Sequence, residues 1–349
     1  MAGGGGTRFW PLSRQKTPKQ LLNLSGNGLM INETIERIQG VISTDNIFIV
    51  TSELQGDKMK ASVGDMILNH HILLEPAARN TAACIGYAAE EIVTKYEDGI
   101  MCIFPSDHYI KNQEGFHKVL LKAIEAAETQ DKLVTIGIKP TFPSTGYGYI
   151  HYTPEDASGV YSVDRFIEKP PLKEARQYME RPGYAWNSGM FVWKASTILK
   201  EFERFLPKVY QYLEQIAASM GTDGEQETIK KLYSLIPSFS IDYGIMERSD
   251  NVAVIPGDFG WNDVGSWDSL GALYDLDAMG NIIRGEQVNI NTKNSICYAE
   301  KRLIATIGIE NMIVVETEDA VLVCNKDQAQ NVKEVVEQLK ERGLVEYLI

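Results

Sequence analysis

The chain has 349 residues, 44% of them hydrophobic, and a formal net charge of −13. This length and composition suit one large folded domain with a smaller companion, and they exclude a disordered chain. The acidic balance argues against nucleic acid or an anionic membrane as a partner, because both would require a basic surface. The cysteines are scattered without a CxxC pair, so the sequence indicates neither a zinc cluster nor a disulfide framework and predicts reduced cysteines in a cytoplasmic protein. They are Cys84, Cys102, Cys297 and Cys324.

Near the N-terminus, four consecutive glycines (Gly3–Gly6) are followed by basic residues. Glycines leave the backbone without Cβ atoms, so its N–H groups can close around an anion. Arg8 and Lys19 add cationic side chains suited to phosphate. A Walker loop would end in Gly-Lys-Ser/Thr, and a dinucleotide-binding loop would need a glycine at Arg8. A flexible glycine-rich terminus is the alternative interpretation, and the ordered run from Phe9 to Arg14 argues against it.

Apolar runs of strand length alternate with helical patterns between residues 33 and 138. We predict strands at 46–51, 72–74, 100–105 and 133–138, and helices at 33–38, 81–96 and 116–128. This alternation is typical of an α/β fold with a doubly wound, mostly parallel sheet. In such a sheet, ligands bind outside the carboxyl ends of the strands.

The alternation breaks after residue 138, and the character of the sequence changes again near residue 281. Segments 145–150, 160–167 and 186–193 are predicted to form a smaller insertion, followed by helices at 198–206 and 209–220. Short β-like pieces follow at 287–291, 295–299, 303–307, 312–316 and 320–324. Val332, Val335, Val336 and Leu339 then share one face of a last helix. We therefore predict a large α/β domain at 1–280 and a small β domain at 281–349.

The glycine loop, with Phe9–Arg14 and Pro18–Gln20, resembles the nucleotide-binding loop of the sugar-1-phosphate nucleotidylyltransferases. In detail it is similar to that of the mannose-1-phosphate guanylyltransferases, and the resemblance covers nearly the whole chain. The resemblance implies a Rossmann-like catalytic domain, a short left-handed β-helix often used for dimer contacts, and hence a homodimer. It also implies transfer of GMP from GTP to mannose 1-phosphate with Mg²⁺, by in-line attack of the sugar phosphate on the α-phosphorus and loss of pyrophosphate.

Two aspartates are candidate Mg²⁺ ligands, since this hard cation prefers carboxylate and phosphate oxygens. Asp107 follows a predicted strand, and Asp263 lies in a tight turn before Gly265. Each alone could equally be a helix N-cap or a turn residue. The resemblance assigns both to the metal, and it leaves His108 a supporting role.

The remaining site residues follow from the resemblance. Glu75 would accept hydrogen bonds from guanine N1–H and N2–H₂. Because Glu168 and Lys169 are adjacent in an extended stretch, we expect their side chains to point in opposite directions, toward sugar hydroxyls and sugar phosphate. An exposed ion pair is the alternative there, and Asp242 is expected to be structural. The nucleotide-binding residues would be Gly3, Gly4, Gly6, Thr7, Glu75, Asn80 and Thr81, the sugar-binding residues Gly148, Glu168 and Asn187, and the catalytic cations Arg8, Lys19 and Lys169.

Two alternatives stay open: a nucleotidylyltransferase for another base or sugar, and a non-catalytic regulatory subunit that binds sugar nucleotide. The presence of Arg8, Asp107, Lys169 and Asp263 favours an enzyme. A loop of this kind normally follows a buried strand, whereas only two residues precede Gly3. We therefore expect the loop to lack that anchor, which is the feature that favours the regulatory alternative.

Overall fold

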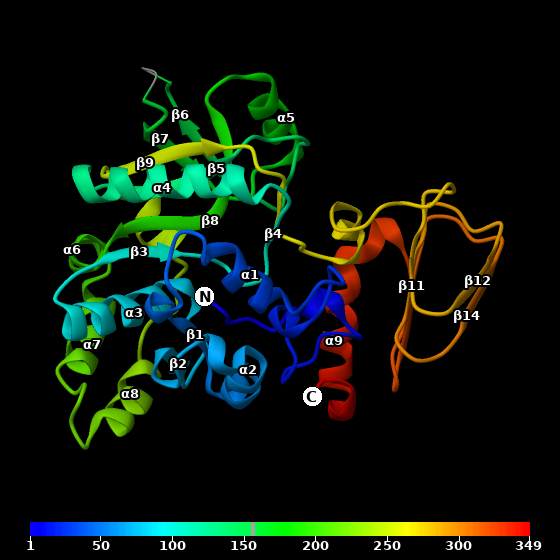
Figure 1. Cartoon of the computed structure of the whole chain (residues 1–349), viewed down its shortest axis with the longest axis horizontal. Helices are drawn as coiled ribbons and strands as arrows, with labels where there is room; N and C mark the ends of the chain where they lie inside the picture. Colours follow the sequence, from blue (N-terminus) through cyan, green and yellow to red (C-terminus); the bar gives the residue numbers. More distant parts are fainter. Residues whose placement is uncertain (155–157) are drawn as a thin grey trace.

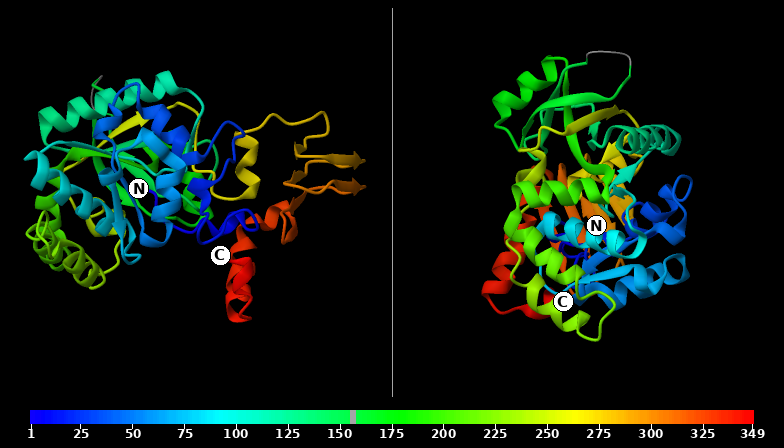
Figure 2. Two further views of the ribbon diagram at one scale, coloured as in Figure 1. Left: turned by 60° about the horizontal axis from the view of Figure 1, so that its bottom comes forward. Right: turned by 90° about the vertical axis from the view of Figure 1, so that its left-hand side faces the viewer.

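The computed structural model describes residues 1–154 and 158–349. An α/β domain is followed by a smaller β-rich domain, and the last helix, α9 (Val332–Glu341), lies at the junction between them (Figures 1 and 2). The fold class predicted from the sequence is confirmed: a Rossmann-like α/β domain with a β-helix-like C-terminal domain. Within the described residues, no helix is both long and apolar enough to cross a membrane.

Two separate sheets form the centre of the α/β domain. The smaller contains a parallel pair, β1 (Ile49–Ser52) and β2 (Ile72–Glu75). The larger has six strands in the order β3-β8-β5-β9-β7-β6. Its members are β3 (Ile100–Ile103), β5 (Leu133–Ile138), β6 (Tyr149–Tyr152), β7 (Tyr161–Ile167), β8 (Tyr184–Lys194) and β9 (Val252–Gly257).

The larger sheet is mixed rather than mostly parallel, which corrects the expected strand arrangement. Among the described residues of this sheet, only β5 and β9 pair in parallel, and β8 runs antiparallel between β3 and β5. The expected separate insertion at 186–193 is therefore wrong, because this segment is a central strand. Its near-continuous burial follows from helices covering both faces of the sheet.

Helices cover the sheets on both sides (Figure 1). One apolar core lies beneath α1, α2, α4 and α5, and a second lies beneath α3, α6, α7 and α8. Along α4, the buried residues Phe116, Leu120, Ala123 and Ala127 recur at helical spacing. The helices are α1 (Met30–Ile38), α2 (Gly56–Val63), α3 (Asn80–Tyr96), α4 (Gln113–Gln130), α5 (Leu172–Glu180), α6 (Ala195–Phe205), α7 (Pro207–Ala217) and α8 (Glu225–Tyr233).

The C-terminal domain stacks short strands in parallel. Strands β11, β13 and β15 pair in register, β16 closes that sheet antiparallel, and β12 pairs with β14 in a second sheet. Ile282, Ile296 and Ile313 stand opposite one another in successive strands and form a buried apolar stack. The strands are β11 (Ile282–Arg284), β12 (Gln287–Ile290), β13 (Ile296–Ala299), β14 (Ile304–Ile307), β15 (Met312–Glu316) and β16 (Val321–Asn325).

Candidate active site

A two-stranded ribbon brings the two predicted metal ligands together. β4 (Tyr109–Ile110) pairs antiparallel with β10 (Trp261–Asn262), and Tyr109 stands opposite Asn262. Continuing this register by one residue places Asp263 across from His108 and beside Asp107. The β4–β10 pairing thus brings Asp107, which follows β3, close to Asp263 in its distant turn.

Lys19 lies between these two aspartates. Its ammonium forms an ion pair with Asp107 Oδ2 at 3.0 Å and donates a hydrogen bond to the main-chain oxygen of Asp263 at 2.5 Å. Only 5% of Lys19 is exposed. Burial alone would raise the pKa of the Asp107 carboxyl, but Lys19 outweighs it and the pKa lies below its ordinary value. The site therefore holds an ionised carboxylate.

The glycine loop packs directly against Lys19. Gly6 has a φ of +54°, and a Cβ there would lie 2.6 Å from Lys19 Cβ and 2.8 Å from Lys19 N. Glycine is therefore required at Gly6 by conformation and by space. Gly4 also has a positive φ, of +97°. At the start of the loop, a Cβ on Gly3 would lie 3.5 Å from Glu75 Oε2.

Residues after the loop attach it to both domains. Phe9 is fully buried, with its ring 5.3 Å from that of Trp267. Trp267 Nε1 donates to the main-chain oxygen of Trp10, and Trp10 Nε1 donates to that of Tyr347. Arg14 adds an ion pair with Asp319 at 2.7 Å. The position of the loop therefore depends on both domains.

A cavity of about 230 Å³ opens beside Asp263. Of the predicted residues, its lining includes Thr81, Gly148, Glu168, Asn187 and Asp263. The cavity thus brings the candidate sugar-binding residues next to one candidate metal ligand.

The orientation of Asn187 in the cavity is fixed by its neighbours. Its Nδ2 donates to Asp242 Oδ1 at 2.6 Å, and its main-chain N–H donates to the oxygen of Gly148 at 2.8 Å. A Cβ on Gly148 would lie 2.5 Å from Glu168 Oε2, so this glycine allows the close approach of Glu168. Asp242 begins a π-helical turn, Asp242–Met246, and burial raises the pKa of its carboxyl.

Glu168 and Lys169 do not point in opposite directions, which corrects the sequence-based expectation. Their side chains form an ion pair with Lys169 Nζ 2.7 Å from Glu168 Oε1. The reason lies in the backbone: β7 ends at Ile167, and Lys169 has a φ of +45° that turns the chain. Lys169 is 61% exposed at its side chain, whereas Glu168 faces the cavity.

Among the candidate base-binding residues, Glu75 lies beside the start of the glycine loop, whereas Thr81 lines the cavity. Glu75 is 8% exposed, and Tyr233 donates to its Oε1 at 2.5 Å. Burial raises the pKa of the Glu75 carboxyl. Asn80 begins α3 with a φ of +66°. Thr81 Oγ1 accepts from the N–H of Ile241, which ties this loop to the segment containing Asp242.

Sequence reasoning missed Tyr147, which donates its hydroxyl hydrogen to Asp263 Oδ1 at 2.7 Å. The signal was present, because Tyr147 stands between two glycines in a segment already assigned to the sugar side. His108 Nδ1 accepts from Trp261 Nε1 at 3.1 Å, and burial lowers the pKa of His108 to about 4. A neutral, hydrogen-bonded His108 agrees with its expected supporting role.

The donor set fits a magnesium ion shared with a phosphate substrate. Within residues 1–154 and 158–349, no group of three or more His, Cys, Asp or Glu side chains could hold a metal. Asp107 and Asp263 supply two carboxylates in one place, and Mg²⁺ is commonly bound by one or two carboxylates plus substrate phosphates. The structure does not bring two predicted site residues into the cavity lining. Thr7 and the cationic Arg8 both lie exposed on the short helix Thr7–Phe9.

A glycine loop that packs on a buried lysine, above two carboxylates at a sheet edge, defines a nucleotide-binding transferase site. Residues 1–278 match the family described as nucleotidyl transferase, and residues 285–339 match a mannose-phosphate isomerase/GMP-like β-helix domain. The chain belongs to the nucleotidyl transferase family, in the group of the mannose-1-phosphate guanylyltransferases.

Three relatives illustrate this similarity. A putative mannose-1-phosphate guanylyltransferase of Vibrio cholerae serotype O1 is 40% identical over 99% of this chain and 75% of that protein. The mannose-1-phosphate guanylyltransferase of Salmonella muenchen is 40% identical over 99% of this chain and 74% of that protein. A crystal structure described as mannose-1-phosphate geranyltransferase, from Thermus thermophilus, is 34% identical with a TM-score of 0.88, covering 97% of this chain and 98% of that one.

Proposed function

We propose that this protein transfers GMP from GTP to mannose 1-phosphate, forming GDP-mannose and pyrophosphate. The observation that carries the proposal is the placement of Lys19. It contacts both Asp107 and Asp263 and packs against Gly6. Asp263 in turn lines the cavity together with Glu168 and Asn187. Similarity over almost the whole chain to proteins named mannose-1-phosphate guanylyltransferase supports the choice of base and sugar.

In this reaction the sugar phosphate is itself the nucleophile, so the protein needs no Ser, Cys or His nucleophile. The task is to align two anionic substrates and to stabilise charge as it develops. The backbone N–H groups of Gly3, Gly4 and Gly6 would bind the triphosphate, with Thr7 at the end of the loop. Arg8 would bind the leaving pyrophosphate, since a guanidinium can donate two parallel hydrogen bonds to phosphate.

Magnesium would be held by Asp107 and Asp263, and when bound it would supply positive charge at the α-phosphate oxygens. Lys19 would keep both aspartates in place and add charge near the triphosphate. Tyr147, through its hydrogen bond to Asp263 Oδ1, would fix the orientation of that carboxylate. Lys169 would bind the sugar phosphate after leaving its exposed ion pair with Glu168.

Substrate choice would come from two groups of polar residues. Glu75 would accept hydrogen bonds from guanine N1–H and N2–H₂, with Asn80 and Thr81 beside the nucleoside. On the sugar side, Asn187 and Glu168 would bind hydroxyls, and Gly148 leaves space for Glu168. Adenine and the pyrimidines lack guanine's adjacent pair of N–H donors, so the buried Glu75 carboxylate would bind them less favourably.

A homodimer is part of the proposal. The strands β12 and β14 carry exposed apolar side chains, with Ile290 48% and Ile307 71% exposed and opposite each other in register. This face lies at the end of the molecule farthest from the α/β domain (Figure 1). Two copies related by a twofold axis would bury it. Light scattering on Ile307→Lys should then show a smaller species than on the unmodified chain; equal masses would contradict the dimer.

The predicted domain division at residues 280 and 281 remains a proposal, as does the cytoplasmic location. All four cysteines are unpaired, which suits a reducing compartment.

A substrate panel tests the proposed reaction. The rate of pyrophosphate release is measured with GTP, ATP, UTP or dTTP against mannose 1-phosphate or glucose 1-phosphate, each with Mg²⁺. The proposal predicts the highest kcat/KM for GTP with mannose 1-phosphate. A preference for another pair would support a different nucleotidylyltransferase, and no release with any pair would support the regulatory alternative.

A further inference from the structure

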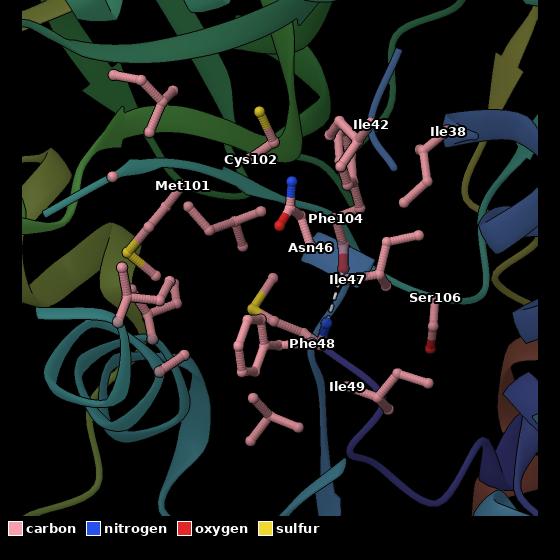
Figure 3. A pocket seen from close by; sticks show the side chains of 18 of the residues that line it. Ile38, Ile42, Asn46, Ile47, Phe48, Ile49, Met101, Cys102, Phe104 and Ser106 are labelled. Atoms are coloured by element: carbon pink, nitrogen blue, oxygen red, sulfur yellow. Dashed lines mark hydrogen bonds between the residues drawn. The ribbon is translucent and has the colours of Figure 1, made fainter. Parts of the chain in front are cut away.

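The strand β1 passes from an apolar environment to a polar one along its length. Ile49 borders a second cavity, of about 510 Å³, and most of the side chains labelled around it in Figure 3 are apolar. After Val50 the chain becomes polar, with Thr51 in the strand and Gln55 at the end of the short helix Glu53–Gln55. Both side chains are buried, with Thr51 0% and Gln55 5% exposed. Buried polar side chains need hydrogen-bond partners, so their partners show what they hold in place.

Gln55 uses all four hydrogen-bonding positions of its side-chain amide. Its Nε2 donates to the main-chain oxygens of Gly4 at 3.4 Å and Gln15 at 3.2 Å. Its Oε1 accepts from Gln20 Nε2 and Thr51 Oγ1, each at 3.3 Å. An amide has two N–H donors and two acceptor lone pairs, so no position is left over. Main-chain oxygens can only accept, which fixes the nitrogen on the side of the glycine loop. We call Gln20, Thr51 and Gln55 the Gln55 network.

The Gln55 network holds carbonyl oxygens of the glycine loop. Gly4 O accepts from Gln55 Nε2, and Ala2 O, just before the loop, accepts from Gln20 Nε2 at 2.6 Å. By contrast, the N–H groups of Gly3–Gly6 donate to no protein atom within residues 1–154 and 158–349. Carbonyl oxygens repel a phosphate, whereas N–H groups attract it. The network therefore engages the oxygens of the loop and leaves its N–H groups available to an anion.

We propose that Gln55 is a positioning residue for triphosphate binding, which holds the glycine loop with its N–H groups toward the phosphates. The inference rests on the proposed function, because that reaction places the triphosphate of GTP at this loop. Gln55 acts through the loop and contacts no substrate. Its amide also fixes Gln15 O, four residues before Lys19, so one side chain links the glycine loop to the segment that carries Lys19. A loop held in its binding arrangement loses less affinity to ordering than a loop that must be ordered by the ligand.

Removing the amide should weaken nucleotide binding and leave the chemical step unchanged. Gln55→Met keeps the length of the side chain but has no N–H donor. If the loop then takes its binding arrangement about a tenth of the time, its affinity for a triphosphate falls about tenfold. The loop would bind the triphosphate equally before and during transfer. We therefore expect KM for GTP to rise about tenfold, with kcat and the KM for mannose 1-phosphate within about twofold of the unmodified chain.

Gln287 in the C-terminal domain provides a matched control. Its Nε2 also donates to two main-chain oxygens, those of Arg284 and Cys297, each at 2.6 Å. Gln287→Met and Gln55→Met should both lower the thermal midpoint, because each leaves two main-chain oxygens with one donor fewer. Binding of inorganic tripolyphosphate with Mg²⁺ is then measured on the full chain by isothermal titration calorimetry. We expect Gln55→Met to bind it about tenfold more weakly than the unmodified chain, and Gln287→Met to bind it equally well.

Unchanged tripolyphosphate affinity in Gln55→Met would overturn the inference even if the thermal midpoint falls, because the network would then support only the fold. Equal weakening in Gln287→Met would also overturn it. If Gln55→Met does not fold, the isosteric Thr51→Val removes the hydroxyl that contacts Gln55 Oε1 and should weaken tripolyphosphate binding about threefold. Unchanged affinity in that variant would again overturn the inference. Tripolyphosphate contains neither guanine nor sugar, so intact binding without GMP transfer would contradict the proposed reaction and not the role of Gln55.

Discussion

Alanine substitutions along the glycine loop separate two physical requirements that meet at Gly6. In Gly6→Ala the new methyl group would contact Lys19 Cβ at 2.6 Å and Lys19 N at 2.8 Å, and the residue would have to keep a φ of +54°. The left-handed conformation costs about 1–2 kcal/mol. Forced overpacking costs about 1–3 kcal/mol more. We therefore expect a loss of about 2–5 kcal/mol in the free energy of unfolding.

Two neighbouring glycines serve as controls. At Gly4, φ is +97° but no atom lies within 4 Å of the added Cβ, so Gly4→Ala should cost only the conformational part, about 1–2 kcal/mol. At Gly5, the nearest contact is an ordinary 3.7 Å to Thr7 Cγ2 and φ lies outside the left-handed region. Gly5→Ala should therefore be neutral or stabilising by less than about 1 kcal/mol.

Urea unfolding of the three variants, followed by circular dichroism, gives the comparison. The predicted order of stability is Gly5→Ala, then Gly4→Ala, then Gly6→Ala. A Gly6→Ala midpoint equal to that of Gly5→Ala would refute the packing of the loop on Lys19.

Three further predictions concern single carboxylates and one hydroxyl. Asp263→Asn should lower kcat about 10²-fold or more with an unchanged thermal midpoint. The control Asp258→Asn, at an exposed position, should leave both kcat and the thermal midpoint unchanged. Normal turnover of Asp263→Asn with Mg²⁺ would contradict the metal assignment. Tyr147→Phe should lower kcat about tenfold, since Asp263 loses one charged hydrogen bond, and wild-type kcat would argue against this positioning. Burial and the nearby Glu214 raise the pKa of the Glu90 carboxyl to about 7. The folded chain therefore binds the carboxyl proton more tightly than the unfolded chain does. As a result, the free energy of unfolding falls as pH rises from about 4.5 to 7. Glu90→Gln removes the cost of a buried charge at this position. In urea unfolding at pH 8 its free energy of unfolding should exceed that of the unmodified chain by up to about 3 kcal/mol, with little difference at pH 4. An equal gain at both pH values would exclude titration of Glu90 as the cause.

Local patterns in the sequence predicted much of the fold. Apolar runs located β5 and most other strands within a few residues, and helical spacing located α3, α4 and α9. Helices α5 and α8 were missed because each buries only two side chains, which is too few for a periodic signal. The central position of β8 was also missed, since an apolar run does not reveal which strands lie beside it.

In the candidate site too, sequence patterns identified individual residues but not the contacts between segments far apart in the chain. The composition of the glycine loop and the aspartates Asp107 and Asp263 could be singled out from sequence. Their convergence through Lys19 could not, because it depends on the β4–β10 pairing of distant segments. The ion pair of Glu168 with Lys169 was mispredicted because a positive φ at Lys169 cannot be read from the residue type.

GTP labelled at the α-phosphate offers the most direct test of the central claim. The labelled nucleotide is incubated with the full chain, mannose 1-phosphate and Mg²⁺, and the products are separated. The account predicts that the label enters GDP-mannose, in an amount equal to the unlabelled pyrophosphate released, and only when both substrates are present. Label found in GDP or GMP alone, or pyrophosphate released without mannose 1-phosphate, would contradict transfer of GMP to the sugar phosphate.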